Sequence, residues 1–217
     1  CSSLHWTYQI EHFSQNYQVI WFDYRGHQNS EMPVDLNSMK IEVLSQDLKG
    51  LLEHLKIKKA VFLGHSMGVN IVLEQAKLNP KSIAGMVLAN GTPRNPGQTI
   101  FRTNAFSKLF SFLKAIEDKS PRLLDTIWNL QKKNPFGKYL VGLGGFNLHL
   151  TDKQDVDFYV QQVLSMDPHL MIHLINAYDH YDSTSWLSEI KAPALILAGQ
   201  KDLVIPVEQQ ELMHQLM

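Results

Sequence analysis

The sequence predicts an α/β protein with a doubly wound, mostly parallel sheet and an inserted helical cap. Two observations lead to this class. Apolar runs of strand length, such as residues 60–63 and 83–89, alternate with amphipathic helical patterns, and the connections are too long for β-hairpins. The alternation then stops between residues 94 and 182, where helical patterns continue without a strand-like run. Strands joined by such helical connections lie parallel in right-handed βαβ units, so we expect one sheet with a helical insertion.

The first elements are predicted to be a short helix, a strand and a longer helix. Residues 6–13 place apolar side chains at helical spacing, and residues 38–55 do so over a longer stretch, with Ser38 as a candidate N-cap. Between them, Tyr17–Phe22 (YQVIWF) is an almost continuous apolar and aromatic run. Such a run is typical of a strand that is covered on both faces, as in a parallel sheet.

The remaining core elements continue the alternation. Residues 60–63 are predicted to form a strand that leads into a helix, and this helix ends at Asn79-Pro80. Residues 83–89 form the next predicted strand. Residues 194–198 resume the sheet after the insertion, and residues 207–217 form a final helix.

We assign residues 1–93 and 183–217 to an α/β-fold core and residues 94–182 to a helical cap. The cap segment is rich in aromatic residues, among them Trp128 and Phe146. Because inserted helices of this kind act as lids over a site, we expect these two side chains to contact substrate. The alternative is that the aromatic residues form the cap's own core.

Composition narrows the function classes. The chain of 217 residues has a net charge of −1, so it offers neither a basic field for nucleic acid nor a polybasic face for membranes. It has no apolar run near the roughly eighteen residues that a membrane span needs. Cys1 is the only cysteine, which excludes an intrachain disulfide and fits a cytoplasmic location. We expect a small-molecule substrate and, without a phosphate loop or dinucleotide fingerprint, no cofactor and no metal.

The sequence Gly64-His65-Ser66-Met67-Gly68 lies where the predicted strand turns into a helix. A Gly-x-Ser-x-Gly pattern in that context predicts a nucleophile elbow, with Ser66 exposed at a strained turn. We expect Gly64 and Gly68 to be glycine because a β-carbon at either position would collide with the neighbouring strand or helix. The N–H of Met67, at the start of the helix, is a candidate oxyanion-hole donor. A chance occurrence of the short pattern is the alternative.

Asp202 follows the predicted strand at residues 194–198. The carboxyl ends of parallel strands share one edge of a sheet, and ligands bind there, so Ser66 and Asp202 are expected on the same rim. The alternative role for Asp202 is to cap a turn before Pro206, because aspartate is common at such positions.

These motifs make the sequence resemble the α/β-hydrolase superfamily over the whole chain. Asp23–Ser30 (DYRGHQNS) looks like the family's Asp-x-Arg-Gly-x-Gly-x-Ser loop, with Gln28 at the second glycine, and Gly199–Pro206 looks like its acid loop. The resemblance implies a serine hydrolase in which Ser66 attacks an acyl group and Asp202 orients a triad histidine. Asn90, at the other position that some relatives use for the acid, is an amide and cannot supply the charge.

The resemblance places two catalytic parts outside residues 1–217. The strand with the second oxyanion donor is expected before Cys1, and the triad histidine is expected after Met217. We therefore expect residues 1–217 alone to be inactive. His214 follows Asp202 within the final predicted helix, with no strand to return the chain to the rim, so it is a weak candidate for the base.

The resemblance implies a carboxylesterase-like enzyme for a small, apolar ester. Serine at the elbow argues against haloalkane dehalogenase and epoxide hydrolase chemistry, which related families run through a carboxylate. Three alternatives stay open: a cofactor-free haloperoxidase, a C–C bond hydrolase, and a non-catalytic binding module on the same fold. A Gly-His pair behind one more strand after Met217 would favour an enzyme.

Overall fold

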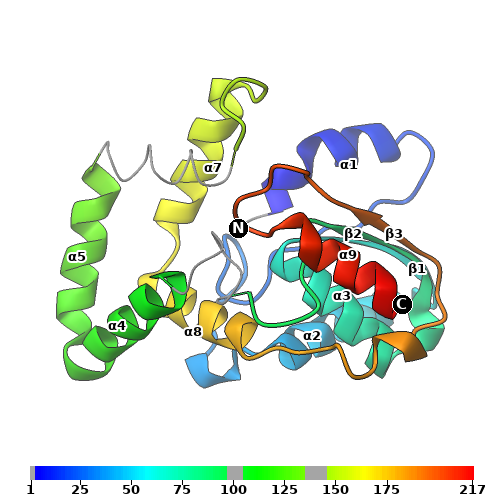
Figure 1. Cartoon of the computed structure of the whole chain (residues 1–217), viewed down its shortest axis with the longest axis horizontal. Helices are drawn as coiled ribbons and strands as arrows, with labels where there is room; N and C mark the ends of the chain where they lie inside the picture. Colours follow the sequence, from blue (N-terminus) through cyan, green and yellow to red (C-terminus); the bar gives the residue numbers. More distant parts are fainter. Residues whose placement is uncertain (1–2, 97–104, 135–145) are drawn as a thin grey trace.

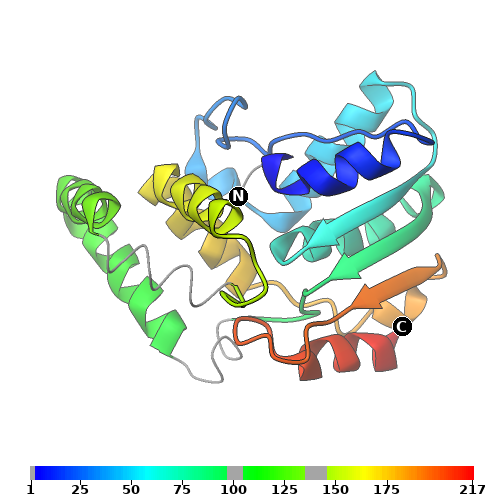
Figure 2. The same ribbon diagram turned by 90° about the horizontal axis from the view of Figure 1, so that it is seen from above.

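The computed structural model describes residues 3–96, 105–134 and 146–217. Within them, three strands form a parallel sheet in the order β1-β2-β3 (Figures 1 and 2). The strands are β1 (Ala60–His65), β2 (Ile83–Ala89) and β3 (Ala194–Leu197). The predicted α/β class with a parallel sheet is confirmed.

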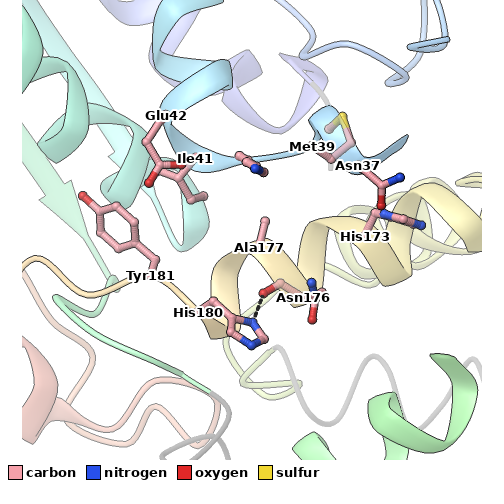
Figure 3. A pocket seen from close by; sticks show the side chains of 10 residues that line it. Asn37, Met39, Ile41, Glu42, His173, Asn176, Ala177, His180 and Tyr181 are labelled. Atoms are coloured by element: carbon pink, nitrogen blue, oxygen red, sulfur yellow. Dashed lines mark hydrogen bonds between the residues drawn. The ribbon is translucent and has the colours of Figure 1, made fainter. Parts of the chain in front are cut away.

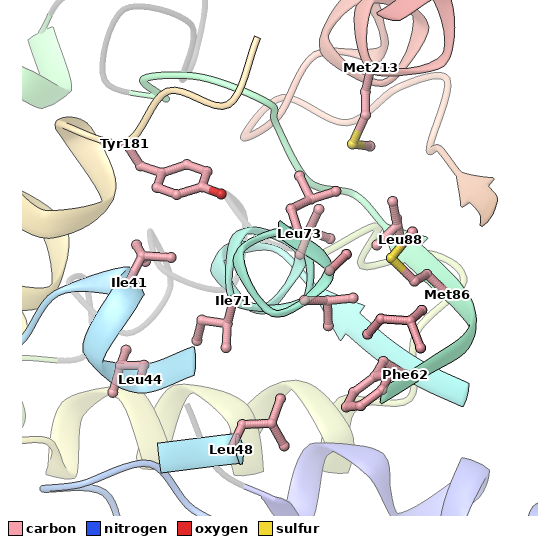
Figure 4. Packing of buried hydrophobic residues seen from close by; sticks show 14 of the residues in the cluster. Ile41, Leu44, Leu48, Phe62, Ile71, Leu73, Met86, Leu88, Tyr181 and Met213 are labelled. Carbon is pink, nitrogen blue, oxygen red and sulfur yellow. The ribbon is translucent and has the colours of Figure 1, made fainter. Parts of the chain in front are cut away.

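Two helices cover one face of this sheet. They are α2 (Ile41–His54) and α3 (Met67–Leu78), and α3 packs between α2 and the strands (Figure 4). The buried side chains between these helices and the strands form the main hydrophobic core. Full burial of one aliphatic side chain stabilises a fold by about 2 kcal/mol. At most 1% of each of these core side chains is exposed: Leu44, Ile71, Leu73 and Leu88.

The predicted strand at Tyr17–Phe22 is not formed, and this expectation was wrong. The structure gives residues 18–24 no regular secondary structure, and Tyr17 and Trp21 are exposed. A strand requires a hydrogen-bonded neighbour, and among the described residues β1 is paired with β2 only. The chain begins with the short 3-10 helix η1 (Ser3–Trp6) and helix α1 (Thr7–Phe13). The apolar run follows α1 as a connection without regular secondary structure.

Ser38 does not cap α2, which corrects the second local expectation. The N-cap of α2 is Lys40, whose side chain makes no capping hydrogen bond. Ser38 instead ends a 3-10 helix, η2 (Leu36–Ser38), and its hydroxyl donates to the Asp35 carbonyl oxygen at 2.6 Å. The helical spacing of apolar residues thus predicted the position of α2 correctly. The preceding 3-10 turn determines the residue at which α2 begins.

Between β2 and β3 the described chain contains helices and no strand. The helices are α4 (Ala105–Lys119), α5 (Pro121–Lys133), α7 (Lys153–Ser165) and α8 (Pro168–Asp179), and they lie to one side of the sheet in both views (Figures 1 and 2). Among the described residues, no helix has both the length and the apolar character that crossing a membrane requires.

Helix α8 contacts both α4 and α5 through His169. His169 Nδ1 lies 2.8 Å from Glu117 Oε1 on α4, and His169 Nε2 lies 3.3 Å from Asp125 Oδ1 on α5. Partial burial alone would lower the pKa of His169, but the hydrogen bond to Glu117 and the nearby carboxylates raise it above its ordinary value. The imidazole therefore joins three helices through charge-assisted contacts.

After α8 the chain returns to the core through the 3-10 helix η5 (Leu187–Glu189). A further 3-10 helix, η3 (Pro80–Ser82), lies between α3 and β2. The last helix, α9 (Val207–Leu216), lies beside β3 and buries Met213 against the main core. The observed bounds of α9 agree with the helix that the sequence predicts after residue 206.

Candidate active site

Ser66 occupies a strained turn between β1 and α3. Its backbone angles are φ 54° and ψ −126°, a combination that non-glycine residues rarely adopt. The turn is held by two hydrogen bonds: Ser66 N–H donates to the Ala89 carbonyl oxygen and the Val69 N–H donates to the Ser66 carbonyl oxygen, each at 3.0 Å. A strand–turn–helix geometry of this kind presents the serine hydroxyl at the end of the sheet.

The two glycines of the motif have different roles. A β-carbon on Gly64 would lie 2.6 Å from the Gly68 carbonyl oxygen, so the strand and helix approach too closely for any side chain at Gly64. A β-carbon on Gly68 would meet only the Tyr24 hydroxyl, at an ordinary contact distance of 3.6 Å. The expected collision is therefore present at Gly64, and the expectation was wrong for Gly68.

Met67 is the first residue of α3. The first four N–H groups of a helix have no intrahelical acceptor, and the helix dipole adds partial positive charge at this end. The Met67 N–H therefore belongs to a set of donors that can stabilise an anionic oxygen close to Ser66.

Asp202 lies in the loop after β3, where hydrogen bonds hold both of its carboxylate oxygens. Asp202 Oδ1 accepts from the N–H groups of Val204 and Ile205 at 2.8 and 2.9 Å. These two bonds are the turn-capping contacts that the sequence offered as an alternative role. The other oxygen, Oδ2, accepts from the Asn90 side-chain amide at 2.7 Å. The carboxylate is thus fixed from its own loop and from the end of β2.

The carboxyl ends of the three strands meet at one edge of the sheet, and this edge carries Ser66, Asn90 and Asp202. Ser66 is linked to the end of β2 through Ala89, and Asn90 N–H donates to the Leu197 carbonyl oxygen of β3 at 2.9 Å. Asn90 has φ 47°, a left-handed conformation that asparagine tolerates better than most residues. Asn90 lacks the charge of a triad acid, and its role as the donor to Asp202 becomes visible only in the structure.

Tyr178 on α8 is a second residue near the elbow that the sequence pattern does not reveal. Its side chain is buried and its hydroxyl lies beside the Ser66 side chain. Burial raises the pKa of the Tyr178 phenol; a hydrogen bond with the Ser66 side chain partly opposes this shift, and the Asp202 charge adds to it. The phenol therefore stays protonated near neutral pH, close to both predicted catalytic side chains.

Comparison with known proteins identifies the family. A family model described as the alpha/beta hydrolase fold matches residues 1–217. This chain belongs to the alpha/beta hydrolase fold family. Mouse (Mus musculus) Epoxide hydrolase 4 is 27% identical over 218 residues, which cover 95% of this chain and 58% of that relative. The chain thus spans little more than half the length of this curated relative.

Solved structures show the same fold. A thermophilic esterase from Thermogutta terrifontis is 22% identical with a TM-score of 0.76, and the match covers 100% of this chain and 74% of that structure. A bromoperoxidase from Bacillus anthracis is 20% identical with a TM-score of 0.78, covering 100% and 76%. At these identities the similarity establishes the fold alone.

The loop from Asp23 to Ser30 contains one residue, Gln28, at which this chain departs from the family pattern. Gln28 stands where that pattern has a glycine, and its φ is 45°, in the left-handed region that glycine adopts without strain. The Gln28 side-chain amide donates to the Gln162 side chain of α7. Gln28 therefore adopts a strained backbone conformation, and its side chain connects this loop to α7.

The histidines that the structure describes do not complete a triad with Ser66 and Asp202. None that the structure describes makes a hydrogen bond to Ser66 or Asp202, and His214 is exposed on α9. His5 reaches the vicinity of His65, and burial lowers the pKa of His5 to about 4, so its ring is neutral. The triad histidine stays a prediction for chain beyond residue 217, as does the second oxyanion donor for chain before residue 1.

The two aromatic residues predicted to contact substrate have packing contacts within the helical segment. Trp128 Nε1 donates to the Met166 carbonyl oxygen at 3.1 Å, which joins α5 to the end of α7. Phe146 packs edge-on against Tyr159 at 4.9 Å between ring centroids and borders a small cluster of buried residues on α7. These contacts fit the alternative that they form the segment's own core. A substrate role for either residue stays a prediction.

Replacing Phe146 with alanine separates these two roles. We expect Phe146→Ala to lower the melting temperature by several degrees, because it removes a partly buried ring from the α7 cluster. The rates on short and long acyl esters should then fall in parallel. A changed preference for acyl length at an unchanged melting temperature would instead place Phe146 at the substrate. Thermal unfolding and a p-nitrophenyl ester series give the two measurements.

A cavity of about 460 Å³ lies between the start of α2 and helix α8 (Figure 3). Neither Ser66 nor Asp202 lines it. Its lining includes His173 and Asn176 of α8 and His180, the residue that follows α8, and the His180 Nδ1 lies 2.7 Å from the Asn176 carbonyl oxygen. This cavity is therefore separate from the candidate active site at the sheet edge.

Proposed function

We propose that the protein is a carboxylesterase-like serine hydrolase that forms an acyl-enzyme at Ser66. The observation that carries the proposal is the strained conformation of Ser66 at the end of β1, with Asp202 fixed on the same edge of the sheet. A non-glycine residue in such a conformation costs about 1–3 kcal/mol, and strain of this kind is retained at functional sites.

In the proposed mechanism the Ser66 Oγ attacks the acyl carbonyl carbon while a histidine accepts its proton. Asp202 orients that histidine and stabilises the imidazolium, and the Met67 N–H donates to the developing oxyanion. Collapse of the tetrahedral intermediate expels the alcohol, which takes the proton from the imidazolium. Water then attacks the acyl-enzyme by the same route and releases the acid. The residues assigned here need no cofactor and no metal.

We propose that residues 94–182 form a lid over this site. Residues 1–93 and 183–217 form the core that carries the site. Helix α8 supports this role, since its Tyr178 lies near Ser66 and Asp202. The helices of the segment are rich in apolar and aromatic residues, which favours a small, apolar ester as the substrate. A role of Trp128 and Phe146 in substrate selection within this lid stays a prediction, which the Phe146→Ala comparison tests.

Epoxide hydrolysis is the second candidate, because Mus musculus Epoxide hydrolase 4 is similar over most of the chain. Serine at the elbow disfavours it on chemical grounds. A carboxylate that opens an epoxide forms an ester, and water hydrolyses an ester. A serine alkoxide would form an ether, which water does not cleave under these conditions. An acyl substrate gives Ser66 an intermediate that can turn over.

A fluorophosphonate probe tests the proposal on the full-length protein. We expect one label per chain, located by peptide mass spectrometry on Ser66, because an activated serine attacks phosphorus as it attacks an acyl carbon. The same protein should hydrolyse p-nitrophenyl butyrate and leave styrene oxide unchanged. Diol formation from styrene oxide without ester turnover would replace our proposal with epoxide hydrolysis, and a label on another residue would move the nucleophile.

A further inference from the structure

His169, at the start of α8, has a carboxylate opposite each of its two ring nitrogens. Nδ1 lies 2.8 Å from Glu117 Oε1 on α4, and Nε2 lies 3.3 Å from Asp125 Oδ1 on α5. An ionised carboxylate only accepts hydrogen bonds, so both nitrogens must carry a proton for both contacts to be hydrogen bonds. The geometry therefore fits the doubly protonated, positively charged imidazolium.

Charged groups from all three helices surround this imidazole. On α4, the Lys114 Nζ lies 2.9 Å from the Glu117 Oε2, so a second cation supports that carboxylate. The other titratable or charged side chains nearby are Asp118 on α4, Asp125 on α5, Asp167 at the N-cap of α8 and His173 on α8. The groups that face the ring nitrogens directly are carboxylates, which favour the charged form of His169.

The two carboxylates differ in burial, and this difference decides which proton the imidazole loses first. The Glu117 side chain is 9% exposed, whereas the Asp125 side chain is 50% exposed. Loss of a hydrogen bond is costly for a buried carboxylate, while an exposed one can bind water instead. The neutral imidazole therefore keeps its proton on Nδ1, toward Glu117, and Nε2 gives up its own.

Loss of the Nε2 proton changes the contact with α5. A bare ring nitrogen and a carboxylate oxygen are both acceptors, so they repel each other, and the exposed Asp125 side chain can turn into solvent. We propose that the Nε2 proton of His169 is a pH-sensitive switch, which holds α5 against α8 in acidic solution and loosens α5 in alkaline solution. The hydrogen bond from His169 to Glu117 on α4 is kept in both states.

The direction of the pKa shift agrees with this geometry. Partial burial lowers the pKa of His169, but the hydrogen bond to Glu117 and the charges of Asp167, Glu117 and Asp125 raise it above its ordinary value. When the pKa is higher in the folded state, the charged form stabilises the fold at low pH. This contribution is lost as the pH rises through the pKa of the folded state.

Other contacts keep α5 in place when the Nε2 proton is absent. Leu124 is 1% exposed, and Trp128 Nε1 donates to the Met166 carbonyl oxygen at 3.1 Å. The expected change is therefore a local opening of α5, while the rest of the segment stays folded. In the proposed lid, to which α5 belongs, this opening makes substrate access depend on pH.

Hydrogen exchange of the backbone amides of α5 in the full-length protein tests this switch. Protection factors, which correct for the intrinsic effect of pH on exchange, are compared at about pH 5.5 and about pH 9, on either side of a raised histidine pKa. In the wild type, protection of residues 123–130 should fall by about fivefold at the higher pH, the size expected for a partly exposed ion pair. The amides of α7 should keep their protection.

Asp125→Asn removes the pH dependence without removing the contact. The asparagine oxygen accepts from a protonated Nε2, and its NH₂ donates to a bare Nε2. Protection of α5 in this variant should therefore agree within about twofold at the two pH values. Asp118→Asn is the matched control, because Asp118 is also an exposed aspartate but pairs with Lys114, which stays charged in this range. It should keep the wild-type fall.

Three results would overturn the switch. The first is wild-type protection of α5 that is equal at the two pH values. The second is a wild-type fall in Asp125→Asn, because the dependence would then belong to another titrating group. The third is a loss of protection that includes α7 equally, which would indicate general unfolding. The measurement needs no ester turnover, so failure of the serine hydrolase proposal would leave these outcomes unaffected.

Discussion

Ser66→Ala in the full-length protein is expected to abolish turnover of p-nitrophenyl butyrate, with a loss of about 10⁶-fold in kcat. The hydroxyl is the only group at the elbow that can form the acyl-enzyme in our proposal. The backbone at this position has φ 54°, and alanine and serine are both strained there, so the substitution leaves the folding energy nearly unchanged. Steady-state kinetics and circular dichroism measure the two effects.

Ser185→Ala is the control for this loss, because Ser185 is an exposed serine in the segment that follows α8. It should retain wild-type rates. Ester turnover by Ser66→Ala above a hundredth of the wild-type rate would show that the elbow serine is not the nucleophile. An unfolded Ser66→Ala would be recognised by its circular dichroism spectrum, and Ser66→Cys, which keeps a nucleophile of similar size, would then supply the comparison.

Asp202→Asn is expected to lower kcat by about 10⁴-fold, because an amide favours the wrong histidine tautomer and cannot stabilise the imidazolium. The loss should be catalytic and not structural. An asparagine oxygen can still accept from the N–H groups of Val204 and Ile205, which preserves the turn. Its new NH₂ would face the Asn90 amide, and Asn90 can turn over to present its oxygen instead.

Thermal unfolding separates the triad role of Asp202 from the turn-capping role. A tenfold or smaller change in kcat, with a melting temperature that falls by several degrees, would leave Asp202 as a turn cap only. Asp152→Asn supplies the comparison, since Asp152 caps α7 by accepting from the Gln154 N–H at 2.7 Å and lies in the helical segment. That variant should change neither the rate nor the melting temperature substantially.

Local patterns in the sequence were enough to locate most of the fold. The helical periodicity before residue 55 and after residue 206, and the apolar runs of β1, β2 and β3, correspond to elements in the structure. These signals depend on neighbours within a turn or two of the chain, so the sequence alone carries them. The elbow is also a local signal, because its strand, its turn and its helix follow one another directly in the chain.

Prediction failed where an element depends on a distant partner. Tyr17–Phe22 has the composition of a buried strand, but a strand also needs a neighbour to accept its hydrogen bonds, and β1 pairs only with β2 in the described chain. The motif also did not show whether a side chain would fit at Gly68. Whether a β-carbon collides there depends on the packing of Tyr24, which the elbow sequence does not contain.

The sequence by itself determined the α/β class, the elbow with Ser66, and Asp202 as an acid at the end of a late strand. Only the tertiary structure decided what surrounds them. Asn90 and Asp202 are separated by 112 positions, and they meet because β2 and β3 are neighbours in the sheet. Tyr178 comes close to Ser66 because α8 is fastened to the core at its end. Such contacts depend on how the layers pack, which residue spacing along the chain does not specify.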